Sequence, residues 1–338
     1  MSNGSQSQMN MTVGVGFLER VILCTVFTLP CCMLVFINAT LLFTLRRKTV
    51  FRETSRYILL YNLLFADTVL LVQGQLMYIM ATCRITMSYP VCGVLTMLAN
   101  LTTVISPLTL VVMCLERYVA VCYPLRHATI ITVRNTGLAI TVIWTVSSLS
   151  ILTRVLLLLN FPFEDLQSLQ MKRFCGKESM LIDPMSDLYD RSFTSLLFAS
   201  AGVAVICSYI GVMVAARSAS TDKASAHKAR NTLLLHLAQL GLSLSSTKYN
   251  PILVAIFKVL DRIIFARVQI VLYLLIIIFP RCLSCLIYGI RDQTIRPILM
   301  YNLCCQRTRS ISVSVIPAKA KISTCITSWT NIILNKMC

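Results

Sequence analysis

The sequence predicts an all-α membrane protein that folds as a seven-transmembrane helix bundle. First, 57% of its 338 residues are apolar and its mean hydropathy is +0.76, which exceeds the composition of ordinary soluble domains. Second, the apolar residues form long runs separated by charged clusters, and about 20 apolar residues suffice for a helix to cross a bilayer. Third, basic residues concentrate in alternate connections between the runs, which is typical of a chain that crosses a membrane repeatedly.

Seven apolar runs give the predicted helices. The sixth run is the least apolar because His236, Gln239 and Lys248 interrupt it. An odd number of crossings places the two ends of the chain on opposite sides of the membrane. The runs cover residues 21–45, 57–82, 94–115, 136–159, 192–216, 232–257 and 268–290.

The distribution of lysine and arginine predicts the orientation. The first connection is strongly basic, whereas the second has a single arginine and the fourth is rich in acidic residues. Because basic connections remain in the cytosol, we expect a multi-pass plasma-membrane protein with its N-terminus outside and its C-terminus inside. The start lacks the basic residue and apolar core of a cleavable signal peptide.

This orientation divides the chain into four parts. We expect an extracellular N-terminus over residues 1–20, a membrane domain over 21–290, a short juxtamembrane helix over 291–305 and a disordered cytosolic tail over 306–338. The sequons at Asn3 and Asn10 would be glycosylated, since they lie in the external part.

The composition argues against several classes of function. The formal net charge of +18 would suit nucleic acid, but the basic residues lie between apolar runs, where they fix orientation in the lipid bilayer. The sequence has neither a His-Glu-x-x-His metal motif nor a Gly-x-Ser-x-Gly nucleophile turn. We therefore predict no nucleic-acid partner, no enzyme activity, no metal and no cofactor.

The third run ends abruptly in Glu116, Arg117 and Tyr118. An acid and a base side by side at a membrane boundary can neutralise each other, and breaking the pair frees the arginine. The alternative is a simple interfacial anchor, since arginine and tyrosine both favour that zone.

The wider pattern around these residues has a family resemblance. The stretch from Glu116 through Cys122-Tyr-Pro-Leu-Arg126 resembles the third-helix signature of rhodopsin-like G-protein-coupled receptors, in the form typical of odorant receptors. The stretch Lys228-Ala-Arg-Asn-Thr-Leu-Leu-Leu-His236-Leu resembles the start of the sixth helix of odorant receptors. The resemblance covers about residues 20 to 300. It implies that a heterotrimeric G protein binds near Glu116, Arg117, Tyr118, Tyr209, Lys228, His236 and Tyr288.

The resemblance also implies a disulfide on the outside. Cys92 lies at the outer end of the third helix, and Cys175 lies in the long external connection. Rhodopsin-like receptors carry such a bridge, and the external compartment is oxidising. The alternative is two free thiols.

Charged residues also occur at the middle of the membrane. Asp67 lies about 15 Å into the second helix, Ser106 lies at the same depth, and Arg281 lies at this depth in the seventh helix. Related receptors hold sodium at such an aspartate, and Ser284 stands here where they have Asn-Pro. We predict that Arg281 pairs directly with Asp67 in place of sodium, because an unpaired guanidinium is costly there. The alternative is that Arg281 reaches cavity water.

The outer third of the bundle is the predicted ligand cavity. Lys248 is the most informative residue of this cavity. It could anchor a carboxylate-bearing odorant. The alternative is that it snorkels to water or pairs with Asp190 or Glu178. No aspartate stands near Asn100, which disfavours an amine ligand. The predicted lining residues are Asn100, Thr103, Phe193, Thr194, Leu197, Thr247, Lys248 and Tyr249.

These observations favour an odorant receptor of a divergent branch, with small, water-borne ligands. A small-ligand or peptide receptor outside olfaction is one alternative. A channel or transporter is another, because Asp67, Arg281 and Lys248 could line a pathway. The absence of an internal repeat weakens that alternative.

Overall fold

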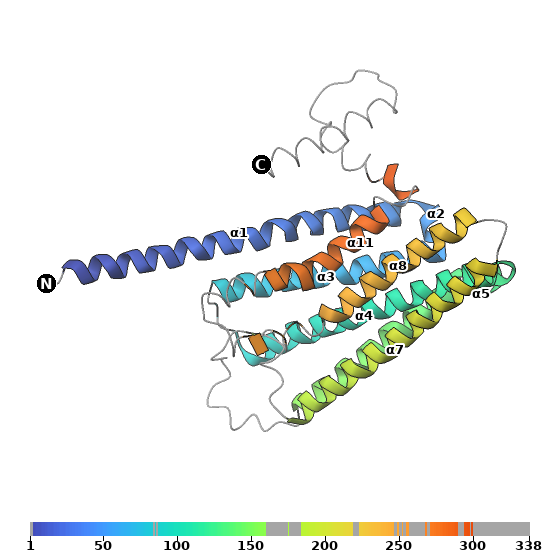
Figure 1. The fold of residues 1–338 in the computed structure, drawn as a ribbon. Helices are drawn as coiled ribbons and strands as arrows, with labels where there is room; N and C mark the ends of the chain where they lie inside the picture. The colour runs from blue at the N-terminus through green and yellow to red at the C-terminus, as the bar shows by residue number, and fades with distance from the viewer. Residues whose placement is uncertain are drawn as a thin grey trace, which may run out of the picture.

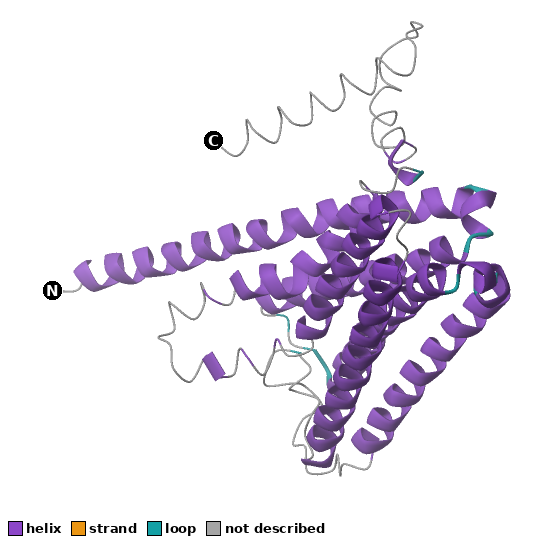
Figure 2. Ribbon diagram, turned by 45° about the vertical axis from the view of Figure 1, so that its right-hand side comes forward, coloured by secondary structure: helices purple, strands orange, loops and turns teal. Residues whose placement is uncertain are grey.

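A computed structural model shows a bundle of long helices (Figures 1 and 2). It describes residues 3–83, 85, 87–159, 175, 184–218, 223–246, 249, 252, 255–256, 268, 271–289, 294–297 and 299. Within these residues, five helices are long and apolar enough to cross a membrane: Cys24–Arg47, Ser55–Met80, Tyr89–Cys122, Val133–Leu159 and Pro184–Ala215. The seventh predicted crossing is present as a shorter apolar helix, Tyr273–Ser284.

The helices follow the predicted order. Six of the predicted segments correspond to α1, α3, α4, α6, α7 and α8, and the seventh corresponds to η4 followed by α11. The described elements are α1 (Asn3–Arg47), α2 (Thr49–Arg52), α3 (Ser55–Thr82), α4 (Tyr89–Cys122), η1 (Pro124–Arg126), α5 (His127–Ile130), α6 (Val133–Leu159), α7 (Pro184–Ser218), α8 (Lys223–Ser246), η4 (Tyr273–Ile278) and α11 (Phe279–Gly289).

Several helices are longer than the apolar runs that predict them. Helix α1 begins at Asn3 rather than near residue 21, and in Figure 1 its first part extends beyond the neighbouring helices. Helix α4 begins at Tyr89, with Ser88 at its N-cap and Pro90 in its first turn, where the missing N–H of proline costs no helical bond. Hydropathy marks only the part of a helix that crosses lipid, whereas the backbone bonds continue into polar sequence.

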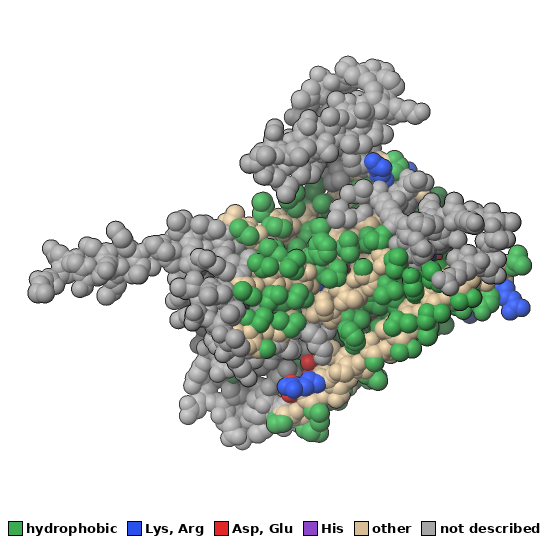
Figure 3. Space-filling view, viewed as in Figure 1, with side chains coloured by type: hydrophobic (Ala, Val, Ile, Leu, Met, Phe, Trp, Pro, Cys, Tyr) green, Lys and Arg blue, Asp and Glu red, His purple; other side chains and the backbone are tan. Residues whose placement is uncertain are grey.

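Helix α4 is the centre of the bundle. It packs against α3, α6, α7 and α8, while α1 packs against α3 and α11. Leu60, Leu63, Leu64, Leu110 and Met113 form the middle of the main core. On the face shown in Figure 3, hydrophobic side chains cover most of the described surface, as contact with lipid requires.

The seventh crossing changes its helical geometry just before Pro280. Residues Tyr273–Ile278 form a π-helix, which passes directly into α11 at Phe279. Proline lacks a backbone N–H and cannot close the usual α-helical bond, so a local rearrangement in the preceding turns is expected. Arg281 follows directly, in the first turn of α11.

Some of the predictions fall beyond the described residues. Thr247 and Lys248 lie outside them, as do residues 306–338 and most of 291–305. Within the juxtamembrane stretch, Ile295 and Leu299 are buried against the main core. The side chains of Asn3 and Asn10 are outside the described part, although both positions belong to the α1 backbone.

Candidate functional site

The C-terminal end of α4 carries a paired acid and base. Arg117 Nε lies 3.2 Å from Glu116 Oε2, and the Glu116 carboxylate is almost fully buried. The other carboxylate oxygen, Oε1, lies 4.0 Å from Nε2 of His127 on α5. Glu116 therefore faces both a guanidinium and an imidazole.

At this end of α4, the Tyr118 side chain packs against α7. A Cβ built on Gly211 would lie 2.3 Å from Tyr118 Cε2, so the ring lies directly against the α7 backbone. Tyr118 also meets Tyr123 edge to face, with ring centroids 6.0 Å apart. Tyr209, on the same part of α7, is partly buried against the main core.

The other predicted G-protein residues are placed only by their backbone. Lys228 and His236 belong to α8, and Tyr288 belongs to α11. Their side chains lie outside the described part of the chain.

At the middle of the bundle, three helices meet around Asp67. Ser106 Oγ donates to Asp67 Oδ1 at 2.8 Å, and Ser284 Oγ donates to Asp67 Oδ2 at 3.2 Å. Gln239 on α8 in turn donates from Nε2 to Ser284 Oγ. The carboxylate of α3 is thereby connected to α4, to α11 and, through one hydroxyl, to α8.

Arg281 corrects one prediction. Among the contacts described, no hydrogen bond or ion pair joins Arg281 to Asp67, although the two charges attract each other. Arg281 Nη1 instead donates to the Ile277 carbonyl oxygen at 3.0 Å, and Nη2 donates to Ser246 Oγ at 3.5 Å. The guanidinium thus points toward its own preceding turn and α8, and each Asp67 oxygen accepts one hydroxyl hydrogen bond.

The two charges nevertheless share one buried pocket. Asp67 and Arg281 are 4% and 3% exposed. The pocket between them has no room for a water molecule. The side chains that enclose it are Leu63, Asp67, Leu110, Gln239, Ser243, Pro280, Arg281 and Ser284.

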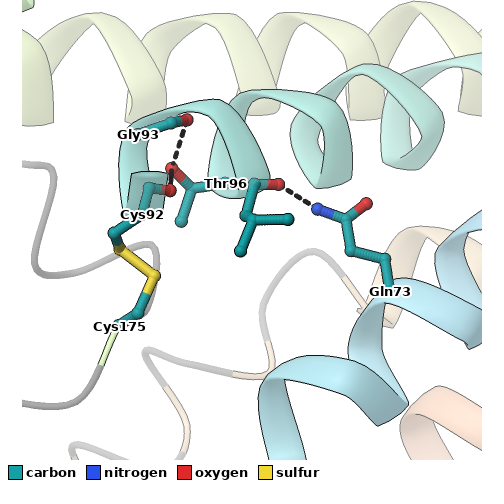
Figure 4. The surroundings of a disulfide bond; sticks show 6 residues. Gln73, Cys92, Gly93, Thr96 and Cys175 are labelled. Atoms are coloured by element: carbon teal, nitrogen blue, oxygen red, sulfur yellow. Dashed lines mark hydrogen bonds between the residues drawn. A yellow bond between two sulfur atoms is a disulfide. The ribbon is translucent and has the colours of Figure 1, made fainter. Parts of the chain in front are cut away.

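The opposite end of α4 carries the predicted bridge. Cys92 and Cys175 form a disulfide with their Cα atoms 5.6 Å apart. Figure 4 shows it at the first turn of α4, with Thr96 donating to the Cys92 and Gly93 carbonyls at 2.9 Å. Nearby, Gln73 on α3 donates to the Leu95 carbonyl. Cys175 is therefore held to the end of the bundle opposite Glu116 and Arg117.

The predicted ligand residues fall into two separate groups. Asn100 and Thr103 are half-buried on α4, and Thr194 and Leu197 belong to the buried face of α7, which packs against α4. Tyr249 instead meets Tyr273 of η4, with ring centroids 6.1 Å apart.

Phe193, another of the predicted lining residues, contacts Tyr189 and Arg154. Its ring stacks on Tyr189 at 5.9 Å, and the Arg154 guanidinium carbon lies 5.9 Å from the Phe193 ring centroid. Arg154 on α6 also forms an ion pair with Asp190 on α7, and it lies 5.5 Å from the Tyr189 ring. Phe193 therefore belongs to the contact between α6 and α7.

Two polar groups of the bundle are not among the residues that the sequence predicts for a site. Arg154 is the only charged residue between positions 135 and 159, and a lone charge in such a run signals a partner. Asn62 carries no charge that would mark it in the sequence. Its side chain donates to Thr109 at 2.9 Å and accepts from Trp144 at 3.0 Å. It thereby ties α3 to α4 and α6.

Comparison with known proteins defines the class of molecule. The family of seven-transmembrane receptors of the rhodopsin type matches residues 37–288. The chain therefore belongs to the rhodopsin family of seven-transmembrane receptors. This confirms the predicted fold class and family, and the chain is a multi-pass membrane protein. Members of this family are receptors and not enzymes.

Particular relatives narrow the comparison. The chain is similar to Odorant receptor 131-2 of Danio rerio, with 34% identity over 277 residues that cover 81% of this chain and 83% of that receptor. It is also similar to Olfactory receptor 7A17 of Homo sapiens, with 27% identity over 199 residues, or 56% of this chain and 63% of that one. Olfactory receptor 1M1 of Mus musculus is 25% identical over 202 residues, or 58% of this chain and 64% of its own.

Proposed function

We propose that this protein is an odorant receptor that binds a small molecule and activates a heterotrimeric G protein. The names of its relatives support the ligand class, since those proteins are odorant and olfactory receptors. The observation that carries the proposal is the Glu116–Arg117 ion pair at the end of α4, 3.2 Å across, in a receptor of the rhodopsin family.

The pair suits a two-state mechanism. While Glu116 holds Arg117, the guanidinium is not available to a partner. A ligand that favours an arrangement with α8 displaced would open the cytosolic end, and a G protein would stabilise that same arrangement. Gln239 on α8 donates to Ser284, and Arg281 donates to Ser246 on α8. Both hydrogen bonds would have to change when α8 moves.

The orientation proposed from the sequence fits this mechanism. The disulfide and the Glu116–Arg117 pair lie at opposite ends of α4. Because disulfides persist in oxidising compartments, this supports an external Cys92 end and a cytosolic Arg117 end at the plasma membrane. The N-terminus, with glycans at Asn3 and Asn10, would then be outside and the C-terminus inside. Labelling of terminal epitopes on intact cells tests this directly.

The ligand would bind in the outer part of the bundle, near Asn100, Thr103, Thr194 and Leu197. We retain Lys248 as the proposed anchor for an anionic, water-borne odorant. Asp190, one of the two acids predicted to neutralise Lys248, is paired with Arg154, which supports the anchor role.

A ligand-free assay tests the coupling. Glu116→Gln removes the charge that holds Arg117, so cells with an olfactory-type G protein should show raised basal cyclic AMP. Arg117→Ala in the same background should abolish the increase. Gly202→Ala serves as the control, because a Cβ at Gly202 contacts nothing within 4 Å. If Glu116→Gln reaches the cell surface and basal cyclic AMP does not rise, the role of the pair is refuted.

A further inference from the structure

His127 lies over the end of α4 without a hydrogen-bond partner for one ring nitrogen. It is the first residue of α5, directly after the turn η1, and this turn brings the imidazole back toward Glu116. His127 Nε2 lies 4.0 Å from Glu116 Oε1, while Glu116 Oε2 pairs with Arg117. The Nε2 atom is buried and makes no hydrogen bond.

The charges around His127 are few and identifiable. Its helix packs against α4 and η1. Helix α4 contributes Glu116 and Arg117, η1 contributes Arg126, and Tyr123 lies at the turn between them. Among these described elements, Glu116 is the only acid. Any positive charge gained by His127 therefore interacts favourably with Glu116 and unfavourably with Arg117.

The separation of 4.0 Å makes this arrangement sensitive to a proton. A neutral imidazole is not a hydrogen-bond partner at that distance. When a proton occupies Nε2, the ring becomes a cationic donor, and a small movement brings it onto Oε1. The Glu116 carboxylate is then shared between two cations, and Arg117 is held less tightly.

We propose that His127 is a cytosolic proton-binding site that weakens the Glu116–Arg117 pair and so raises G-protein coupling. The proposal rests on the proposed function, since it assumes that release of Arg117 permits coupling. The sign follows from the charges. When His127 gains a proton on acidification, Arg117 is released and ligand-independent activity increases.

The test uses the purified full-length receptor in nanodiscs with its G protein and no odorant. Basal nucleotide exchange is measured from about pH 8 to about pH 6, and each rate is divided by that of His127→Gln at the same pH. This ratio cancels the pH response of the G protein itself. We expect it to rise by about two- to fivefold at the acidic end, which corresponds to the coupling energies measured for ion pairs near a surface.

Two further variants sharpen the test. His227→Gln removes a different cytosolic histidine and should keep the wild-type rise. Glu116→Gln removes the carboxylate that Arg117 and His127 share. Its basal nucleotide exchange should be high, and the ratio of its rate to that of His127→Gln should not change with pH. A flat or falling wild-type ratio would overturn the proposal, and so would loss of the rise in His227→Gln.

A second readout separates failure of this proposal from failure of the proposed function. A fluorophore at the cytosolic end of α8 reports its movement without any G protein. If exchange is absent for every variant but acid still moves the fluorophore through His127, the coupling assignment fails and the proton site stands. If exchange occurs and the wild-type and His127→Gln profiles coincide, the proton site is refuted while the receptor function stands.

Discussion

Gly211 on α7 lies directly against the Tyr118 ring on α4. A methyl group added at Gly211 would lie 2.3 Å from Cε2, 3.0 Å from Cδ2 and 3.4 Å from Cζ of the Tyr118 ring. Carbon atoms in good contact are about 3.5 to 4.0 Å apart. Gly211→Ala therefore requires the ring to retreat by about 1.2 Å or more, or α7 to move away from α4.

The cost can be separated from helix propensity by a matched variant. Replacing a glycine inside a helix with alanine ordinarily stabilises by about 0.5 to 1 kcal/mol. Gly202 lies on the same helix, and a Cβ there meets nothing within 4 Å, so Gly202→Ala should show this gain alone. Overpacking costs about 1 to 3 kcal/mol. Gly211→Ala should thus be less stable than Gly202→Ala by about that amount.

Thermal unfolding of the purified receptor measures the difference. Cys114 is buried in the main core, so a thiol-reactive dye reports its exposure as the bundle opens. The unfolding midpoint of Gly211→Ala should lie several degrees below that of Gly202→Ala, at roughly 2 to 4 °C for each kcal/mol. The double variant with Tyr118→Ala should lose the penalty at Gly211, because the ring that caused it is gone.

The reasoning is refuted by either of two results. Equal midpoints for the two alanine variants would mean that Tyr118 does not press on α7. A penalty at Gly211 that persists after Tyr118→Ala would place the strain elsewhere.

Three further predictions concern the charged groups. Arg154→Met should destabilise the receptor by about 3 kcal/mol, because Asp190 then stays buried without that partner; adding Asp190→Asn should recover part of the loss in the same dye assay. Lys248→Met should reduce responses to carboxylate odorants and spare neutral ones in a cyclic AMP assay; equal responses would remove the anchor. Ligand affinity should not distinguish sodium from potassium or choline at equal ionic strength, because the buried cation of Arg281 lies beside Asp67 in a pocket without room for a water molecule; a sodium-specific change would contradict this.

The sequence was sufficient for features that depend on one helix. Hydropathy located the crossings because lipid imposes the same length and polarity on each of them. The Glu116–Arg117 pair is formed between neighbours in the chain, and the depths of Asp67 and Ser106 follow from the constant rise of a helix. Such features need no knowledge of how the helices rotate against one another.

Features that depend on helix rotation could not be predicted. Depth alone placed Arg281 beside Asp67, and the two do line one pocket, but the groups that Arg281 bonds depend on how the seventh crossing and α8 face each other. The contacts of Phe193 with Tyr189 and Arg154 likewise depend on which face α7 turns toward α6, which the sequence does not specify. The helical starts at Asn3 and Pro184 were missed for a different reason, since backbone bonds continue where hydropathy falls.

Contacts at the middle of the bundle join α8 to the seventh crossing, and the proposed mechanism requires α8 to break or exchange them. Gln239 and Ser246 lie seven residues apart on α8, two helical turns, and so share one face. That face bonds Ser284 and Arg281 on the seventh crossing. An outward movement of α8 would break the hydrogen bond between Arg281 and Ser246. Arg281 would then lack this partner in a low-dielectric region, where a cation is costly. Asp67 lines the same pocket. The hydrogen bond between Arg281 and Ser246 therefore favours α8 in the position that the structure shows.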